Sequence, residues 1–259
     1  MLRFRDDRTG SLVDLALSPA VPLRVYVDGA SFGAEFGLRA VRVLLVADVL
    51  VRIAELSGLQ VVTVLAAPGR PPEGLGQTVG ALGLHPLAVA GGAAEADALL
   101  GGRAHVRVAA SAAGRASGGD GVLIGVGPIE DLTPDGRAAQ RCASGGTAGD
   151  PLALRLALLW CPYRQTVKLT QAALAEAEGT VSRWRSAVAK WAAEPSRPIP
   201  AGTAHRISVA FDNDLDTAAA LDLLLNVESD HEAPAGAKFE TFAFADRVLG
   251  LELVREIGR

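Results

Sequence analysis

The sequence predicts an α/β protein in which a Rossmann-like parallel sheet with covering helices is followed by a small C-terminal helical bundle. Short β-rich runs alternate with helical runs over residues 1–126, the order typical of a parallel sheet covered on both faces. After Pro151 the apolar residues recur at helical spacing. Residues 127–149 are rich in Gly, Ser, Thr, Ala and Arg. We therefore expect an α/β domain over 1–126, a linker or long loop over 127–149, and a helical domain over 150–259.

The elements of the α/β part follow from its apolar runs. The expected strands are Leu2–Arg5, Leu12–Leu15, Leu23–Val27, Gln60–Leu65, Pro86–Ala90, His105–Ala109 and Val122–Val126. The expected helices are Leu38–Leu56, Glu73–Leu82 and Ala93–Leu100. We expect the first two strands to form a hairpin across residues 6–10, and Gly58 to cap the end of the first helix.

The helical part contains one strongly amphipathic segment, which begins after a capping Thr170. Its apolar residues are spaced by three or four and share one stripe: Leu174, Ala177, Val181, Trp184, Val188 and Trp191. Such a stripe needs partner helices, which residues 150–160, 217–227 and 237–249 can supply in a small antiparallel bundle. After Pro151 we expect helices joined by exposed connections such as residues 194–202.

The composition limits the classes of function. With a net charge of -4 and a pI of about 5.6, the chain is not expected to act mainly by neutralising nucleic-acid phosphates, and tRNA binding is not expected. Three cations opposite the apolar stripe are expected to form its solvated face: Arg183, Arg185 and Lys190. Cys142 and Cys161 are too few for a zinc site and are expected to be reduced.

No segment is expected to cross a membrane. The longest apolar stretch, residues 41–51, is interrupted by Arg42 and Asp48 and is shorter than the roughly 20 residues that a span needs. It is therefore expected to be a buried helix. The charged residues 1–8 lack the apolar core of a secretory signal, so we expect a cytoplasmic protein.

The loop at residues 28–33 is the prime location for a ligand. It follows the strand Leu23–Val27 directly, and ligands of open α/β sheets bind outside the carboxyl ends of the strands. Its glycines would let a ligand approach the backbone, and the N-terminus of the next helix would attract an anion. The alternative is a connecting loop without a ligand, because a fold does not imply a function.

Two local patterns suggest other chemistry. The run Gly-x-Ser-x-Gly at residues 29–33 has the form of a hydrolase nucleophile elbow, with Ser31 as nucleophile and His205 or His231 as base. It lies too near the start of the chain for the strands that precede such an elbow, and both histidines are in the helical part.

The three aspartates at 212, 214 and 216 open like a calcium loop. The sixth position is Thr217 where Gly is required, and the twelfth is Leu223 where Glu is required. Capping of the next helix by Asp216 or Thr217 is therefore the better interpretation.

Two separated blocks carry a family resemblance. The first runs from Leu23 to Val64 and includes Val-Tyr-Val-Asp-Gly at 25–29 and Ala-Asp-Val-Leu-Val-Arg at 47–52. The second includes Asp-Pro-Leu-Ala-Leu-Arg-Leu at 150–156, Tyr163-Arg164, and Asp-Asn-Asp-Leu-Asp-Thr at 212–217. In this order they resemble the cysteine-activating class I aminoacyl-tRNA synthetases: cysteinyl-tRNA synthetase and the cysteine ligase of mycothiol synthesis. The resemblance covers somewhat over half of the chain and implies a HUP-type Rossmann-like fold with ATP as a candidate cofactor.

The chain departs from this family at the residues that carry its chemistry. The resemblance places Gly37-Leu38-Arg39-Ala40 where the family has its ATP-binding His-Ile-Gly-His turn, and Asp28 where it has a zinc-binding Cys. The family's Lys-Met-Ser-Lys-Ser loop has no counterpart, because all three lysines follow residue 150. Loss of one preorganised charge-stabilising donor costs about 100- to 1000-fold in rate, and at least four such groups are missing. Turnover by the family mechanism is therefore not expected.

The leading hypothesis is a shortened, degenerate member of this group, a non-catalytic paralogue that binds a nucleotide-like or aminoacyl-adenylate-like ligand, or a protein partner. Its expected ligand-binding residues are Asp28, Gly29, Ser31, Gly37, Leu38, Arg39 and Ala40, with no catalytic and no metal-binding residue. One alternative is an ATP-dependent ligase for cysteine or a related amino acid, in which Arg39 and Arg42 replace the lost cations. Arg42 is, however, expected to be a solvated helix residue. A serine hydrolase acting through Ser31 is a distant alternative.

Overall fold

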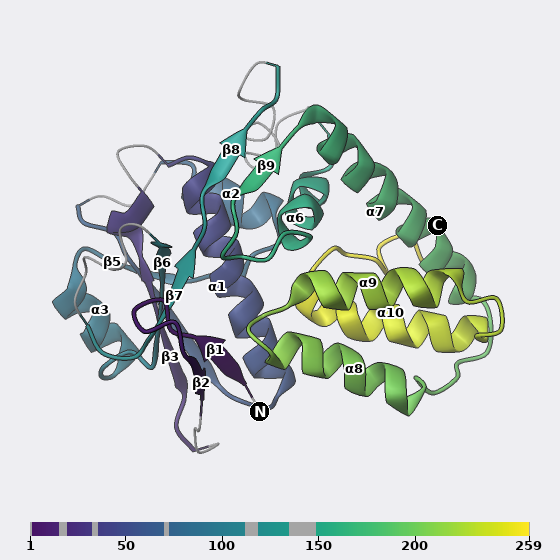
Figure 1. Cartoon of the computed structure of the whole chain (residues 1–259), viewed down its shortest axis with the longest axis horizontal. Helices are drawn as coiled ribbons and strands as arrows, with labels where there is room; N and C mark the ends of the chain where they lie inside the picture. Colours follow the sequence, from purple (N-terminus) through teal and green to yellow (C-terminus); the bar gives the residue numbers. More distant parts are fainter. Residues whose placement is uncertain are drawn as a thin grey trace.

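The computed structural model describes residues 2–15, 20–32, 36–69, 73–111, 119–134 and 149–258, and it confirms the predicted fold class. A parallel sheet lies on one side of the molecule and a group of helices on the other (Figure 1). The long first helix runs between them (Figure 1). The predicted linker at 127–149 is described only at 127–134 and at Gly149.

The central sheet has five parallel strands in the order β5-β4-β3-β6-β7. The strands are β3 (Leu23–Asp28), β4 (Val61–Ala66), β5 (Ala88–Ala90), β6 (Val106–Ala110) and β7 (Val122–Val126). The middle strand β3 pairs Tyr26 with Val64 on one side and with Arg107 on the other. Its apolar residues are buried, as expected of a strand covered on both faces.

The helices of the α/β part cover opposite faces of this sheet. They are α1 (Leu38–Leu56), α2 (Leu75–Ala81) and α3 (Ala93–Leu100). Val25 and Val27 of β3 belong to the large core that includes α1, whereas Tyr26 belongs to a smaller cluster under α3. Gly58 follows α1 with a φ of 81°, the left-handed conformation predicted for its end. The prediction of a solvated Arg42 is wrong, because α1 is buried nearly all round and Arg42 is 1% exposed.

The N-terminal hairpin is confirmed as β1 (Arg3–Arg5) paired with β2 (Leu12–Asp14). It lies against both halves of the molecule. The Asp7 amide donates to the carbonyl of Leu123 in β7, and Arg3 forms an isolated bridge with Asn213. The hairpin therefore contacts the sheet edge and the helical part at once.

The helical part has the predicted apolar stripe on its longest helix. Its helices are α6 (Pro151–Leu159), α7 (Gln171–Trp191), α8 (Ala201–Asp212), α9 (Thr217–Ser229) and α10 (Ala235–Leu249). Thr170 and Asp216 cap α7 and α9 through their side chains, as predicted. Trp184 is completely buried, whereas Trp191 at the end of the stripe is half-buried.

Some expectations for this region were wrong. The short strands β8 (Ile129–Asp131) and β9 (Val167–Leu169) pair in parallel, so residues 127–134 are not all loop and the chain after Pro151 is not all helix. Helix α8 agrees with the expectation that the chain after Pro151 is helical, although its bounds were not predicted. Arg185 is not solvated: it is buried and donates to the Asp150 carboxylate and the Leu251 carbonyl.

One hydrophobic core extends through both halves. Val25 of the sheet, Leu154 of α6 and Phe242 of α10 belong to the same buried cluster, and α1 packs against α10. The division into domains at residues 126 and 150 remains a prediction.

Among the described residues, every helix is too short or too polar to traverse a lipid bilayer.

Candidate functional site

The predicted ligand loop begins with a turn of 3-10 helix, Gly29–Phe32, at the carboxyl end of β3. The Asp28 carboxylate is buried and accepts a hydrogen bond from the Ala30 amide at 3.1 Å. Gly29 lies directly against β4, because a Cβ atom there would come within 2.7 Å of the Ala66 carbonyl oxygen. Only glycine fits this close approach. The rest of the loop, residues 33–35, lies outside the described residues.

Ser31 closes the turn against the neighbouring strand. Its hydroxyl donates to the Asp28 carbonyl at 2.5 Å and accepts from the Ala110 amide, at the end of β6, at 3.1 Å. The side chain is 3% exposed. Both histidines proposed as its base belong to the helical part, His205 in α8 and His231 after α9. Within the described residues, neither of these two histidines belongs to the α/β part that contains Ser31.

The N-terminus of α1 lies at the same edge of the sheet, because β3 ends there and α1 begins ten residues later at Leu38. Gly37 is the N-cap residue, has extended backbone dihedral angles and makes no side-chain capping bond. Leu38 is half-buried and Ala40 is buried, but Arg39 is exposed. The first amides of a helix have no partner within it, so this end carries a partial positive charge beside an exposed guanidinium.

Arg42, one turn further along α1, is fully engaged elsewhere. Its Nη1 atom donates to the carbonyls of Gly127, Pro128 and Gln165 at 2.9, 2.9 and 2.6 Å, and its Nη2 atom donates to Pro162 at 3.1 Å. These carbonyls lie next to β8 and β9. Burial lowers the pKa of Arg42 from its ordinary value. Arg42 therefore joins α1 to two distant loops.

None of the four histidines lies at this edge. His85 precedes β5 and His105 precedes β6, which places both at the amino edge of the parallel sheet. The His105 ring accepts from the Arg24 amide at 3.0 Å, and burial lowers its pKa. Within the described ranges, no three His, Cys, Asp or Glu side chains are grouped so that they could bind a metal ion. The absence of zinc from the protein stays a prediction.

A network of charged side chains lies in the core, centred on Asp48 of α1. Its Oδ2 atom accepts from Arg155 Nη2 at 2.6 Å and from Arg52 Nε at 2.8 Å. Its Oδ1 atom accepts from the His85 amide at 2.8 Å and is 2.7 Å from His85 Nδ1. Burial alone would raise the pKa of Asp48, but Arg155, His85 and Arg52 together hold it well below its ordinary value.

Arg155 extends this network to three elements. Its Nε atom donates to the Leu249 carbonyl at the end of α10, and Nη1 donates to the Leu82 carbonyl after α2, at 2.5 and 3.0 Å. Sequence reasoning aligned Asp48, Arg52 and Arg155 with family motifs but did not predict their contact. The sequence did contain a signal, because Asp48 and Arg155 each lie within an apolar helix. Charged side chains are almost never fully buried unless they are paired, so two such residues could have been expected to pair.

Comparison with known proteins finds relatives that share one name and match only part of this chain. A protein of Thermobifida fusca named L-cysteine:1D-myo-inositol 2-amino-2-deoxy-alpha-D-glucopyranoside ligase is 46% identical over 72 residues, which are 28% of this chain and 16% of that protein. The protein of the same name from Saccharopolyspora erythraea is 34% identical over 116 residues, 42% of this chain and 26% of its own. The matches thus span about a sixth to a quarter of these relatives. No family model matches the chain.

Proposed function

Because this chain is related over part of its length to the cysteine ligases of mycothiol synthesis, as its motifs indicate, we propose that it binds a nucleotide-like or aminoacyl-adenylate-like ligand without adenylating cysteine by the family mechanism. The ligand would lie at the carboxyl edge of the sheet. The observation that carries this proposal is the α1 N-terminus, which has no side-chain cap and presents the exposed Arg39 in its first turn. Phosphate-like groups favour such helix ends.

The buried position of Arg42 supports ligand binding rather than catalytic turnover. The ligase alternative requires Arg39 and Arg42 to replace the cations that hold ATP phosphates. Arg42 already donates to four backbone carbonyls and is buried, so moving it to a phosphate would break all four hydrogen bonds. Arg39 alone would then stand in for at least four missing groups, each worth about 100- to 1000-fold in rate.

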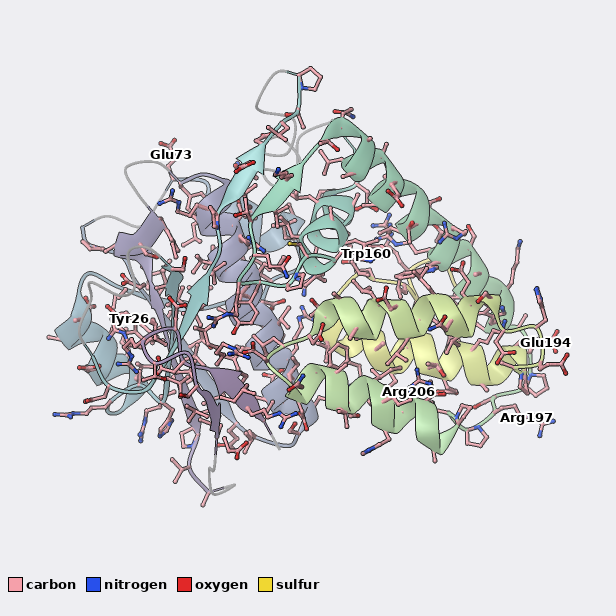
Figure 2. All side chains as sticks on the ribbon, viewed as in Figure 1. Tyr26, Glu73, Trp160, Glu194, Arg197 and Arg206 are labelled. Carbon is pink, nitrogen blue, oxygen red and sulfur yellow. The ribbon has the colours of Figure 1, made fainter. Side chains whose placement is uncertain are left out.

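Ligand binding can be tested by thermal shift with ATP, AMP and a non-hydrolysable cysteinyl-sulfamoyl adenosine. A ligand that binds only the native state raises stability by RT ln(1 + [L]/Kd), so the melting temperature should rise with concentration. Arg39→Gln should reduce the shift. Arg206→Gln is the matched control, since Arg206 is also exposed but lies on α8, in the helical part (Figure 2). No shift with any of the three ligands would refute the proposal.

Turnover is tested separately by cysteine-dependent ATP–pyrophosphate exchange. The proposal predicts exchange no higher than that of a buffer blank. Exchange above the blank that Arg39→Ala abolishes would favour the ligase alternative. We also propose a cytoplasmic location, and binding of a protein partner is the alternative to binding of a small ligand.

A further inference from the structure

A second candidate site lies in a groove between the N-terminal hairpin and the loops that follow α6 and α8. The groove has a volume of about 220 Å³ and contains none of the seven residues predicted from the sequence to bind ligand. Its polar lining residues are Arg5, Tyr163, Arg164, Asn213, Asp214 and Asp216. Ligand pockets for drug-sized molecules occupy about 300–1,000 Å³, so this groove fits a smaller molecule.

In each of the two groove aspartates, one carboxylate oxygen accepts hydrogen bonds from the protein. Asp214 Oδ1 accepts from the Arg5 amide at 2.8 Å and from the Tyr163 hydroxyl at 2.6 Å. Asp216 Oδ1 accepts from the Ala219 amide at 3.0 Å, which caps α9. These contacts orient both carboxylates and leave the second oxygen of each available to a ligand.

The cations of the groove do not neutralise these aspartates. The Arg5 side chain is exposed, and its guanidinium donates to the Gly10 carbonyl at 3.0 Å. Arg164 is paired instead with Asp7, at 3.3 Å. In the part of the chain that the structure describes, no ion pair joins Arg5 or Arg164 to Asp214 or Asp216. Positive and negative groups thus line one small groove without pairing across it.

The aspartate side of the groove is a firmly held loop. Asp214 and Leu215 have φ angles of 59° and 54°, a region that non-glycine residues adopt only when surrounding contacts impose it. The Asp214 amide donates to the Arg3 carbonyl at 3.0 Å, and the buried Tyr163 holds the Asp214 side chain. A ligand would therefore meet groups that are already positioned, which reduces the entropy cost of binding.

We propose that this groove binds a small zwitterion of the α-amino-acid type, with its carboxylate toward Arg5 and Arg164 and its ammonium group toward Asp214 and Asp216. A simple anion would be attracted only by the two guanidinium groups, and a simple cation only by the two carboxylates. A molecule that carries both charges a few ångströms apart satisfies both sides. This inference does not depend on the nucleotide-like ligand proposed above.

The first test titrates the full-length protein with each of the 20 standard amino acids, followed by amide chemical shifts in two-dimensional NMR spectra. Acetate and methylamine serve as single-charge probes. We expect at least one amino acid to shift amides of the residues around Arg5 and Asp214, and to bind more tightly than either probe. Binding of acetate as tight as that of every amino acid, or no binding of any amino acid at about 10 mM, where even a very weak site would respond, overturns the proposal.

The second test removes one charge at a time. Asp216→Asn keeps the helix cap, because Asn and Asp cap equally well, and Arg5→Gln keeps the backbone bond to Asp214. Each should weaken binding about tenfold or more, since hydrogen bonds to charged groups are lost. Arg197→Gln, which lies in an exposed loop at the far end of the bundle (Figure 2), should leave the affinity unchanged. Unchanged affinity in both groove variants overturns the proposal.

Discussion

The Oδ2 atom of Asp48 in α1 lies 2.6 Å from the Nη2 atom of Arg155 in α6, and both side chains are almost completely excluded from solvent. The two residues come from the two separate blocks that carry the family resemblance. Their contact joins the helix that covers the sheet to the first helix of the C-terminal part. The arrangement of the two halves therefore depends on a charge pair in the shared core.

Asp48→Asn should destabilise the protein by about 3–5 kcal/mol, because it removes the charged partner that is hydrogen-bonded to the buried guanidinium of Arg155. Urea unfolding monitored by circular dichroism measures this loss. Asp120→Asn is the control: Asp120 also pairs with an arginine, Arg103, but the two side chains are 58% and 81% exposed. An exposed pair contributes at most about 1 kcal/mol. Similar small losses in both variants would contradict a structural role for the buried pair.

Stability should also fall at acidic pH because of Asp48. Its pKa is lowered in the folded state by Arg155, His85 and Arg52, against the effect of burial. The unfolded chain, with an ordinary Asp pKa of about 3.9, binds a proton before the folded protein does. The contribution is complete above about pH 5 and is lost as the pH falls through the acid range.

The pH dependence is measured as the free energy of unfolding between about pH 6 and 3. The wild-type curve should fall more steeply than that of Asp48→Asn, which lacks this titrating group. Parallel curves would show that other carboxylates account for the acid sensitivity.

Local patterns predicted the fold well where the sequence is periodic. The apolar runs of β3, β4, β6 and β7 and the stripe that ends at Trp191 were assigned within a residue or so. The missed elements carry weak local signals: β8 and β9 have three residues each, and their pairing joins residues almost 40 positions apart. Helix α8 follows a run rich in proline and buries few apolar residues, chiefly Ile207 and Phe211.

The charged residues of the core were harder to predict than the strands. A lone arginine in a helix usually lies at the surface, and the carbonyls that bind Arg42 are about 85 and 120 residues away in the chain. Arg155 likewise meets its partners only after α2 and α10 are in place. The position of the candidate site at the carboxyl edge could be predicted, because it depends only on strand direction.

Trp184→Ala should lower the free energy of unfolding by about 3–5 kcal/mol, as expected for removal of a buried aromatic side chain. Trp184 is completely buried, its ring centroid lies 5.4 Å from that of Phe242, and its Nε1 atom donates to Glu228 at 2.9 Å. Trp191→Ala, at the half-buried end of the same stripe, should cost less. Denaturant unfolding of both variants tests this order. A loss below about 1 kcal/mol for Trp184→Ala, far under the usual range, would contradict the burial of the stripe.

A fluorophosphonate probe should not label Ser31. The hydroxyl is buried, donates to a backbone carbonyl and accepts from a backbone amide, and an unactivated serine is a weak nucleophile. Intact-protein mass spectrometry after incubation with the probe gives the answer. Labelling that disappears in Ser31→Ala would support the hydrolase alternative.

Two arginines on α1, Arg39 and Arg42, should behave in opposite ways when each is replaced by methionine. Arg42→Met retains an apolar side chain but removes four hydrogen bonds to backbone carbonyls. The Pro128 and Pro162 carbonyls still accept from the amides of Val167 and Gln165, whereas the carbonyl of the buried Gly127 loses the bond from Arg42. Since one unsatisfied buried group costs about 1–3 kcal/mol, the loss should be at least about 1 kcal/mol. Arg39→Met changes an exposed side chain and should stay within about 0.5 kcal/mol of wild type.

Ligand binding should show the reverse pattern. Arg39→Met should weaken binding of ATP or the sulfamoyl adenosine analogue, whereas Arg42→Met, assayed at a temperature where it remains folded, should bind as the wild type does. The combined measurement separates a structural arginine from a ligand-binding one on the same helix. If Arg42→Met were as stable as wild type but unable to bind, its guanidinium would have to reach the ligand. The ligase alternative, which needs both cations at the phosphates, would then be the better account.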